Sequence, residues 1–194
     1  MVKYSKIRWL CSTLPACISL VFIPICVPAS AEPSAPKSDA QKSFDLLKTL
    51  AGTWQGPVST EPAQPNMGDR SFTQVTMRVT SRGNALVHEM HEPSVPDDPA
   101  RYDHPLTMFY LDGDRLLLTH YCDAGNRPRM SGKVSPDSKK VEFDFVDLSG
   151  GNQYGHMYHA VFTFIDADHH IADWTYMLPG DKPVRARVDL KRAK

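Results

Sequence analysis

Cysteine is scarce in this sequence, and its distribution excludes a disulfide framework. The chain has 194 residues and four cysteines; Cys11, Cys17 and Cys26 lie within the first 31 residues and only Cys122 lies beyond them. If those 31 residues are removed, no intramolecular disulfide can form. The rest of the chain has the length of one domain and must be stabilised by packing and hydrogen bonding alone.

An excess of basic charge is also missing. Lysine and arginine together number 22, as do aspartate and glutamate. The first 31 residues contribute Lys3, Lys6 and Arg8 and no acidic residue, so the remainder carries a formal charge of about −3. Nucleic-acid-binding domains present a basic patch or stripe. We therefore expect no nucleic acid among the partners of this protein.

The apolar segment near the N-terminus is too short to cross a membrane. It covers residues 18–27, is interrupted by proline, and follows basic residues, whereas a spanning helix needs about 20 apolar residues. The small-x-small pattern Ala29-Ser30-Ala31 comes next. This order predicts a signal peptide over residues 1–31 and a secreted or periplasmic protein without a stable membrane anchor. An uncleaved anchor and a lipoprotein at Cys17 are the alternatives.

One helix is expected, at the start of a single domain over residues 38–194. Residues 32–37 are rich in proline, serine and alanine and indicate a linker. Ser38 can cap a helix, with Gln41 as its reciprocal partner, and Gly52 can end the turn that follows. The apolar residues on one face of this helix are Phe44, Leu47 and Leu50.

From Trp54 onward the apolar pattern alternates with period two, and turn residues recur at short intervals. Asp112-Gly113-Asp114 and Pro136-Asp137-Ser138, for example, separate alternating segments and predict hairpins. About nine consecutive strands follow from this pattern. Because so long a meander must close or leave an exposed edge, we predict an all-β, antiparallel up-and-down β-barrel, with a β-sandwich as the alternative.

The segment Leu50-Ala51-Gly52-Thr53-Trp54-Gln55-Gly56 resembles the Gly-x-Trp opening of the calycin barrels, which include lipocalins, fatty-acid-binding proteins and nitrobindins. The resemblance implies that Gly52, Trp54 and Gly56 are structural, with Trp54 closing one end of the barrel. Segments 118–122 and 125–130 resemble secreted bacterial lipocalin-like domains of largely unassigned function. A nitrobindin-like barrel would bind haem through a late-strand histidine; the candidates are His156, His159, His169 and His170. Haem is disfavoured because Pro57 and Val58 replace a further family glycine.

Several side chains could line a barrel cavity. His120 and Cys122 share a strand face with aliphatic residues, and Asn126 and Arg129 follow in a loop that could bind a polar group. The expected ligand-binding residues are His88, Glu89, Tyr110, His120, Cys122, Asn126, Arg129, Tyr158, Trp174 and Tyr176. His169 and His170 are interpreted as solvated turn residues. No metal site is expected, because the strand around His88 offers at most two ligands on one face and zinc needs a third.

Three functions are compatible with this pattern. The first is a binding or carrier barrel for a small apolar or amphipathic molecule, which the fold commonly serves. The second is an isomerase or hydrolase that uses His120 or Glu89 as general base. The third is a structural or interaction protein with a filled barrel. Apolar residues on both faces of some strands would be covered by the helix or by a partner subunit, as in a homodimer.

Overall fold

The computed structural model describes residues 36–64 and 72–194. The expected signal peptide, and all but the last two residues of the expected linker, lie outside this part of the chain. Residues Pro36–Lys194 form one compact unit. Its secondary structure consists of one α-helix, a single 3-10 turn and ten strands within the described ranges.

Helix α1 (Asp39–Lys48) begins where the sequence predicts. The Ser38 hydroxyl accepts a hydrogen bond from the backbone N–H of Gln41 at 3.2 Å, which satisfies one of the free donors of the first turn. The Gln41 side chain does not complete the expected reciprocal cap. It donates to Asp45 Oδ1 at 2.9 Å. The apolar stripe of α1 is buried, with Leu47 fully inaccessible to solvent.

Ten antiparallel strands follow, one more than the approximate number expected. They are β1 (Gly52–Glu61), β2 (Phe72–Thr80), β3 (Ala85–His91), β4 (Leu106–Asp112), β5 (Arg115–Tyr121), β6 (Arg127–Val134), β7 (Lys140–Ser149), β8 (His156–Asp166), β9 (His169–Leu178) and β10 (Lys182–Arg192). The 3-10 turn η2 (Ser81–Gly83) joins β2 to β3. Each strand pairs with its neighbours in sequence, and β1 pairs with β10, so the sheet closes into a barrel. The predicted fold is confirmed.

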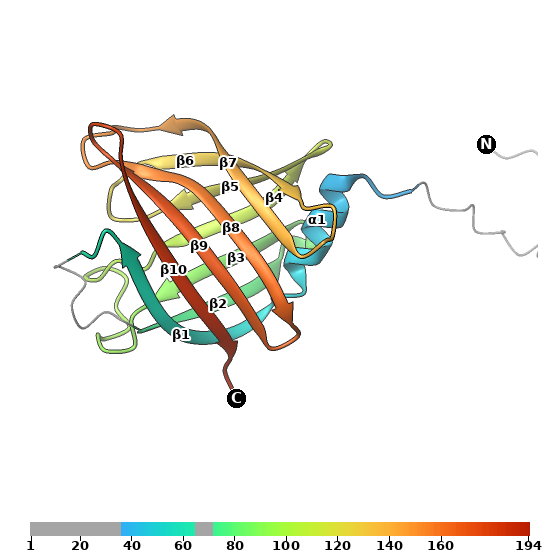
Figure 1. Ribbon diagram of the computed structural model, residues 1–194, viewed down its shortest axis with the longest axis horizontal. Coiled ribbons are helices and arrows are strands. Elements are labelled where there is room, and N and C mark those ends of the chain that lie inside the picture. The colour runs from blue at the N-terminus through green and yellow to red at the C-terminus, as the bar shows by residue number, and fades with distance from the viewer. Residues whose placement is uncertain (1–35, 65–71) are drawn as a thin grey trace, which may run out of the picture. The chain divides into compact units, whose positions relative to one another are not determined.

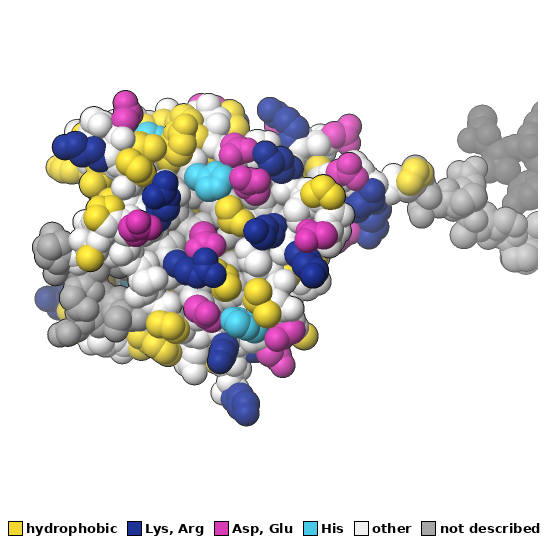
Figure 2. Space-filling view, in the orientation of Figure 1, with side chains coloured by type: hydrophobic (Ala, Val, Ile, Leu, Met, Phe, Trp, Pro, Cys, Tyr) yellow, Lys and Arg dark blue, Asp and Glu magenta, His cyan; other side chains and the backbone are white. Residues whose placement is uncertain are grey.

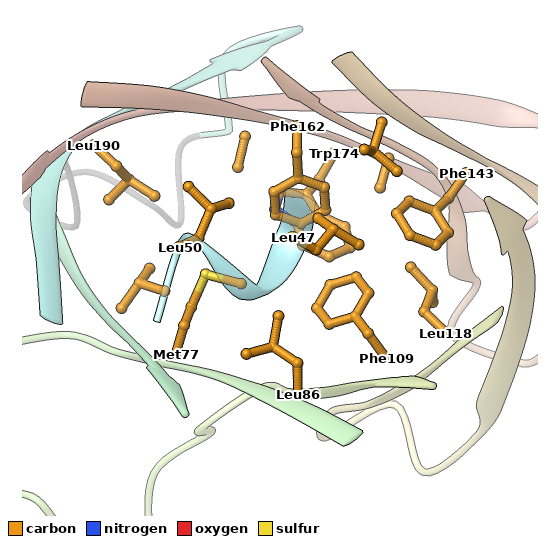
Figure 3. Close-up of a cluster of buried hydrophobic side chains, with 14 of the residues drawn as sticks. Leu47, Leu50, Met77, Leu86, Phe109, Leu118, Phe143, Phe162, Trp174 and Leu190 are labelled. Carbon is orange, nitrogen blue, oxygen red and sulfur yellow. The ribbon is translucent and has the colours of Figure 1, made fainter. Parts of the chain in front are cut away.

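The two ends of the barrel differ (Figure 1). Helix α1 lies at the end where β1 begins, and the long connection from β3 to β4 lies at the opposite end. Leu47 and Leu50 point into the barrel beside Met77, Leu86 and Phe109 (Figure 3). Helix α1 therefore closes one end with apolar side chains.

Trp54 contributes to the same closed end, as the Gly-x-Trp opening predicts. Its side chain is fully buried, and its indole N–H donates to the Leu50 carbonyl at 2.7 Å. The Arg192 guanidinium lies over its ring at 4.1 Å. Trp54 on β1 and Arg192 on β10 are paired in the sheet, so these two strands meet around one rigid aromatic group.

The face of the molecule seen in Figure 2 carries interspersed charges of both signs. Examples are the pairs Arg187–Asp173 at 3.2 Å and Arg192–Asp168 at 3.0 Å on β10 and its neighbours. In the part of the chain that the structure describes, no helix is long and apolar enough to cross a membrane.

Candidate functional site

A cavity of about 300 Å³ lies in the barrel at the end opposite α1. Its walls come from the parts of the strands nearest that end, and they include Val58, Thr73, Met90, His120, Met157, Trp174, Tyr176, Ala186 and Val188. A second cavity of about 260 Å³ adjoins it and shares Met157, Trp174, Tyr176 and Ala186. The barrel is thus packed at one end and hollow at the other.

His120 and Trp174 lie side by side in the wall of this cavity. His120 Nδ1 lies 2.8 Å from the buried Thr107 hydroxyl, which fixes the orientation of the ring. The rings of His120 and Trp174 are 5.8 Å apart. The indole N–H of Trp174 is buried and has no acceptor among the residues that the structure describes. An unsatisfied buried donor of this kind costs about 1–3 kcal/mol.

Two further histidines, His88 and His170, are buried in the barrel in addition to His120. His88 is 1% exposed and its ring lies 5.7 Å from that of Trp174. His170 is fully buried and packs edge-on against Trp54 at 4.3 Å. Neither ring nitrogen of either histidine has a hydrogen-bond partner within the described ranges. Polar groups therefore run from the hollow end to the closed end through an apolar core.

Burial keeps these histidines neutral. Loss of hydration is the main reason that the pKa of His88 falls to about 3, with smaller contributions from His170 and His120. Burial likewise lowers the pKa of His120 to about 4 and that of His170 to about 4. At neutral pH each ring has one donor nitrogen and one acceptor nitrogen.

Acidic groups stand near the mouth of the cavity. Asp103 and Asp123 both line it, and Asp103 accepts a hydrogen bond from the Asp123 backbone N–H at 3.0 Å. Burial raises the pKa of the Cys122 thiol, and these two carboxylates raise it further. Burial, followed by Cys122 and the same carboxylates, raises the pKa of Tyr176 to about 12.

Four of the ten residues expected to bind ligand line the cavity: His120, Cys122, Trp174 and Tyr176. His88 lies deeper in the core. The other five are placed elsewhere. Glu89 is on the strand face opposite the buried His88, and Tyr110 donates to or accepts from the Thr119 hydroxyl at 3.1 Å beside an outer depression.

Asn126, Arg129 and Tyr158 have structural contacts instead. Asn126 Nδ2 donates to the Gly151 and Gly155 carbonyls at 2.9 and 2.7 Å, which ties two loops together. Arg129 pairs with Asp147 on the outer surface. Tyr158 is 41% exposed and stacks on Phe145.

The interpretation of His170 as a solvated turn residue is wrong. Strand β9 begins at His169, so His170 alternates inward with Ala172 and Trp174. His169 faces outward and contacts Asp189 Oδ1 at 2.8 Å.

The described residues do not fit the haem site that a nitrobindin-like barrel implies. Of the late-strand candidates, His159 lies outside near Asp144 at 3.2 Å, and His169 pairs with Asp189. His170 is packed at the closed end, and His156 lies against Phe145. The cavity lining that the structure describes includes none of the four.

One group with metal-binding composition occurs among the described residues, on the outer surface. It consists of Glu142, Asp144 and His159. The Lys133 ammonium lies 3.0 Å from Asp144 and 3.9 Å from Glu142, so a cation already compensates both carboxylates.

Sequence reasoning missed several wall residues. Val58, Ala186 and Val188 lie on strands whose apolar alternation was readable, so that signal was available. Met90 follows from His88 by the same period. Asp103 and Pro105 lie before β4 in the connection from β3, where the sequence has no alternation of apolar and polar residues to follow.

Comparisons with known proteins bear on the fold alone. No family model matches the chain, and no curated protein matches its sequence. The crystal structure of Rv2717c from M. tuberculosis is similar over 78% of this chain and 98% of that chain, with a TM-score of 0.55 and 12% identity. A protein of unknown function from the DUF3598 family of Nostoc punctiforme PCC 73102 matches over 76% of this chain and 49% of its own, with 11% identity and a TM-score of 0.46, too low to carry an argument. The first likeness is one of fold and agrees with the closed antiparallel barrel described above.

Proposed function

We propose that this protein is an exported small-molecule-binding barrel that carries an apolar or amphipathic ligand in the periplasm or outside the cell. The observation that carries the proposal is the hollow end of the barrel, where apolar walls surround a few oriented polar groups. Ligand sites commonly have this composition. The charge order of the first 31 residues supports export.

The catalytic alternative has less support. Glu89 does not line the cavity. His120 does, but burial lowers its pKa to about 4, which makes it a weak general base at neutral pH. A completely filled structural barrel would leave no room for the cavity of about 300 Å³. Binding is therefore the function that the geometry favours.

Native mass spectrometry of the processed protein, purified from the periplasm or medium of the cells that make it, tests the proposal. We expect an N-terminus at Glu32 and an additional bound mass that is released on unfolding. Retention of the protein in the cytoplasm with residues 1–31 intact would contradict export.

A matched pair of variants separates binding in the cavity from binding elsewhere. Ala186 lines both cavities, whereas its neighbour Arg185 is exposed on the same strand. We expect Ala186→Phe to fill the space and abolish the bound mass, and Arg185→Phe to leave it unchanged. Equal loss in both variants, or retention in both, would place the ligand outside the barrel.

A further inference from the structure

The mouth of the cavity is acidic. The lining includes the carboxylates of Glu92, Asp103 and Asp123, and no lysine or arginine belongs to the part of it that the structure describes. Ser94 contacts Glu92, and the Asp123 backbone N–H donates to Asp103 at 3.0 Å. A carboxylate that accepts a hydrogen bond remains negatively charged. The described mouth therefore favours a cation and opposes an anion.

Two of these carboxylates act on side chains of the cavity wall. Burial is the main reason that the pKa of the Cys122 thiol is raised, and Asp103 and Asp123 raise it further. Burial, followed by Cys122 and the two aspartates, raises the pKa of Tyr176 to about 12. The same negative charge that holds a proton on these groups stabilises a cation beside them. The Tyr176 ring adds to this effect, because aromatic faces attract cations.

His120 presents a polar atom to the empty space. The ring is 3% exposed, and its Nδ1 lies 2.8 Å from the Thr107 hydroxyl. Its Nε2 has no hydrogen-bond partner within the described ranges. In contrast to the ring nitrogens of His88 and His170, which are closed off on all sides, Nε2 faces the cavity that the ring lines. A buried polar atom without a partner is costly, so this nitrogen favours an occupied cavity.

The deeper walls are apolar. Trp174 and Val188 are buried, and Val58, Met157 and Ala186 complete this part of the lining. His120 adds no positive charge, because burial lowers its pKa to about 4. A dry apolar cavity of about 150 Å³ accepts benzene, and the cavity here measures about 300 Å³. The space suits an apolar body of about two fused rings.

We infer that the cavity binds an amphipathic organic cation, with an ammonium-type group at the carboxylates of the mouth and an apolar body inside the barrel. A fatty acid or another organic anion is not the ligand. This inference rests on the proposed binding function and specifies the charge of the molecule that the same cavity selects.

Isothermal titration calorimetry with three probes of one ring system tests the inference. The probes are 2-naphthylmethylammonium, 2-naphthylmethanol and 2-naphthoate, which differ in the charge of the polar group. We expect the ammonium to bind about tenfold more tightly than the alcohol, since each partly exposed ion pair contributes up to about fivefold, and the carboxylate to bind most weakly. Raising the salt concentration from about 0.02 M to about 0.5 M should weaken binding of the ammonium and leave that of the alcohol unchanged, because salt screens charges.

A matched pair of variants locates the cation. Asp123 bonds to Asp103 through its backbone N–H, a contact that Asp123→Asn retains. We expect this variant to bind 2-naphthylmethylammonium about threefold more weakly and 2-naphthylmethanol as before. Asp114→Asn removes the same charge from the exposed turn between β4 and β5 and should change neither affinity.

The outcomes separate the two proposals. Equal affinity for all three probes, or tightest binding of 2-naphthoate, would overturn the inference and leave the binding function standing. Unchanged binding of the ammonium in Asp123→Asn would also overturn it, because the cation would then lie away from the mouth. If no probe binds, the molecule released in the native spectrum decides: a neutral molecule or an anion overturns the inference alone, and a clean apo mass overturns both.

Discussion

At the scale of single residues, the interior histidines govern the response of the protein to acid. His88, His120 and His170 are buried and neutral, with pKa values of about 3, 4 and 4 against an ordinary value of 6.5. The unfolded chain binds protons at these rings below about pH 6.5, and the folded chain does not bind them until the lower pH values are reached. Acid therefore favours the unfolded state.

We predict that the free energy of unfolding is highest above about pH 6.5 and falls as the pH decreases toward about 4. Each of the three histidines contributes a slope of at most about 1.4 kcal/mol per pH unit in that window. Urea unfolding between pH 4 and pH 8 measures it. His88→Leu should reduce the slope without loss of stability at pH 7, because the ring nitrogens that it removes have no described partner.

His159→Gln is the matched control for that experiment, since His159 lies on the outer surface beside Glu142 and Asp144. A slope that is the same in His88→Leu and in the unmodified protein would show that protonation of His88 is not coupled to unfolding.

The Cys122 thiol allows a second prediction at this scale. Its pKa is raised by burial and by the nearby carboxylates, so little thiolate is present at neutral pH. We expect iodoacetamide to modify the Cys122 thiol much more slowly than it modifies the thiol of glutathione at pH 7.5. A ligand bound in the cavity should slow the modification of Cys122 further. Mass spectrometry of timed samples measures both rates, and modification at the rate of a free thiol would contradict the placement of Cys122 in the cavity wall.

At the scale of the elements, the approach of β1 to β10 depends on Gly56. A Cβ atom at this position would overlap the backbone carbonyl of Asp189 on the paired strand. Because backbone cannot move aside as a side chain can, Gly56→Ala should destabilise the barrel by about 3 kcal/mol or more. Thermal unfolding followed by circular dichroism measures the loss.

Gly113 provides the comparison for Gly56. Its φ is +59° and nothing lies within 4 Å of an added Cβ, so Gly113→Ala meets only the backbone cost of the left-handed region, about 1–2 kcal/mol. Equal destabilisation by the two alanines would mean that the β1–β10 contact tolerates a side chain.

The elements themselves were largely predictable from sequence, because period-two alternation and turn residues act locally. The strand around Ala186 shows this: its apolar residues face inward and its arginines face outward, as expected. The direction of some side chains was not predictable. Pairing between β8 and β9 shifts register between Met157 and His159, so Met157 lines the cavity and Tyr158 is exposed.

Strands that are apolar on both faces have the same ambiguity. Tyr110 follows the fully buried Phe109 and therefore faces outward. The polar residue Thr107 does not reveal this direction, because it is itself buried on the inner face with Phe109. For Arg129, a register shift beside Met130 adds to the uncertainty. Such irregularities depend on pairing between distant strands, which one sequence does not encode locally.

At the scale of the whole molecule, the closed ring of strands leaves no free sheet edge in the described barrel. We predict that deletion of residues 182–194 removes β10 and leaves one edge of β1 and one edge of β9 unpaired. These free edges should pair between molecules and yield dimers or larger aggregates. Size-exclusion chromatography with light scattering measures this, with deletion of the exposed Lys194 alone as control. A monomeric, folded product of the longer deletion would show that β10 is dispensable.

Closure between β1 and β10 also sets the order of events during synthesis. Trp54 pairs with Arg192, so the ring cannot close before Arg192 has left the ribosome. Contacts between residues so distant in sequence form slowly. If the protein is exported as we propose, the same pairing that closes the finished barrel also keeps the precursor unfolded for longer, which gives the export machinery time to accept it.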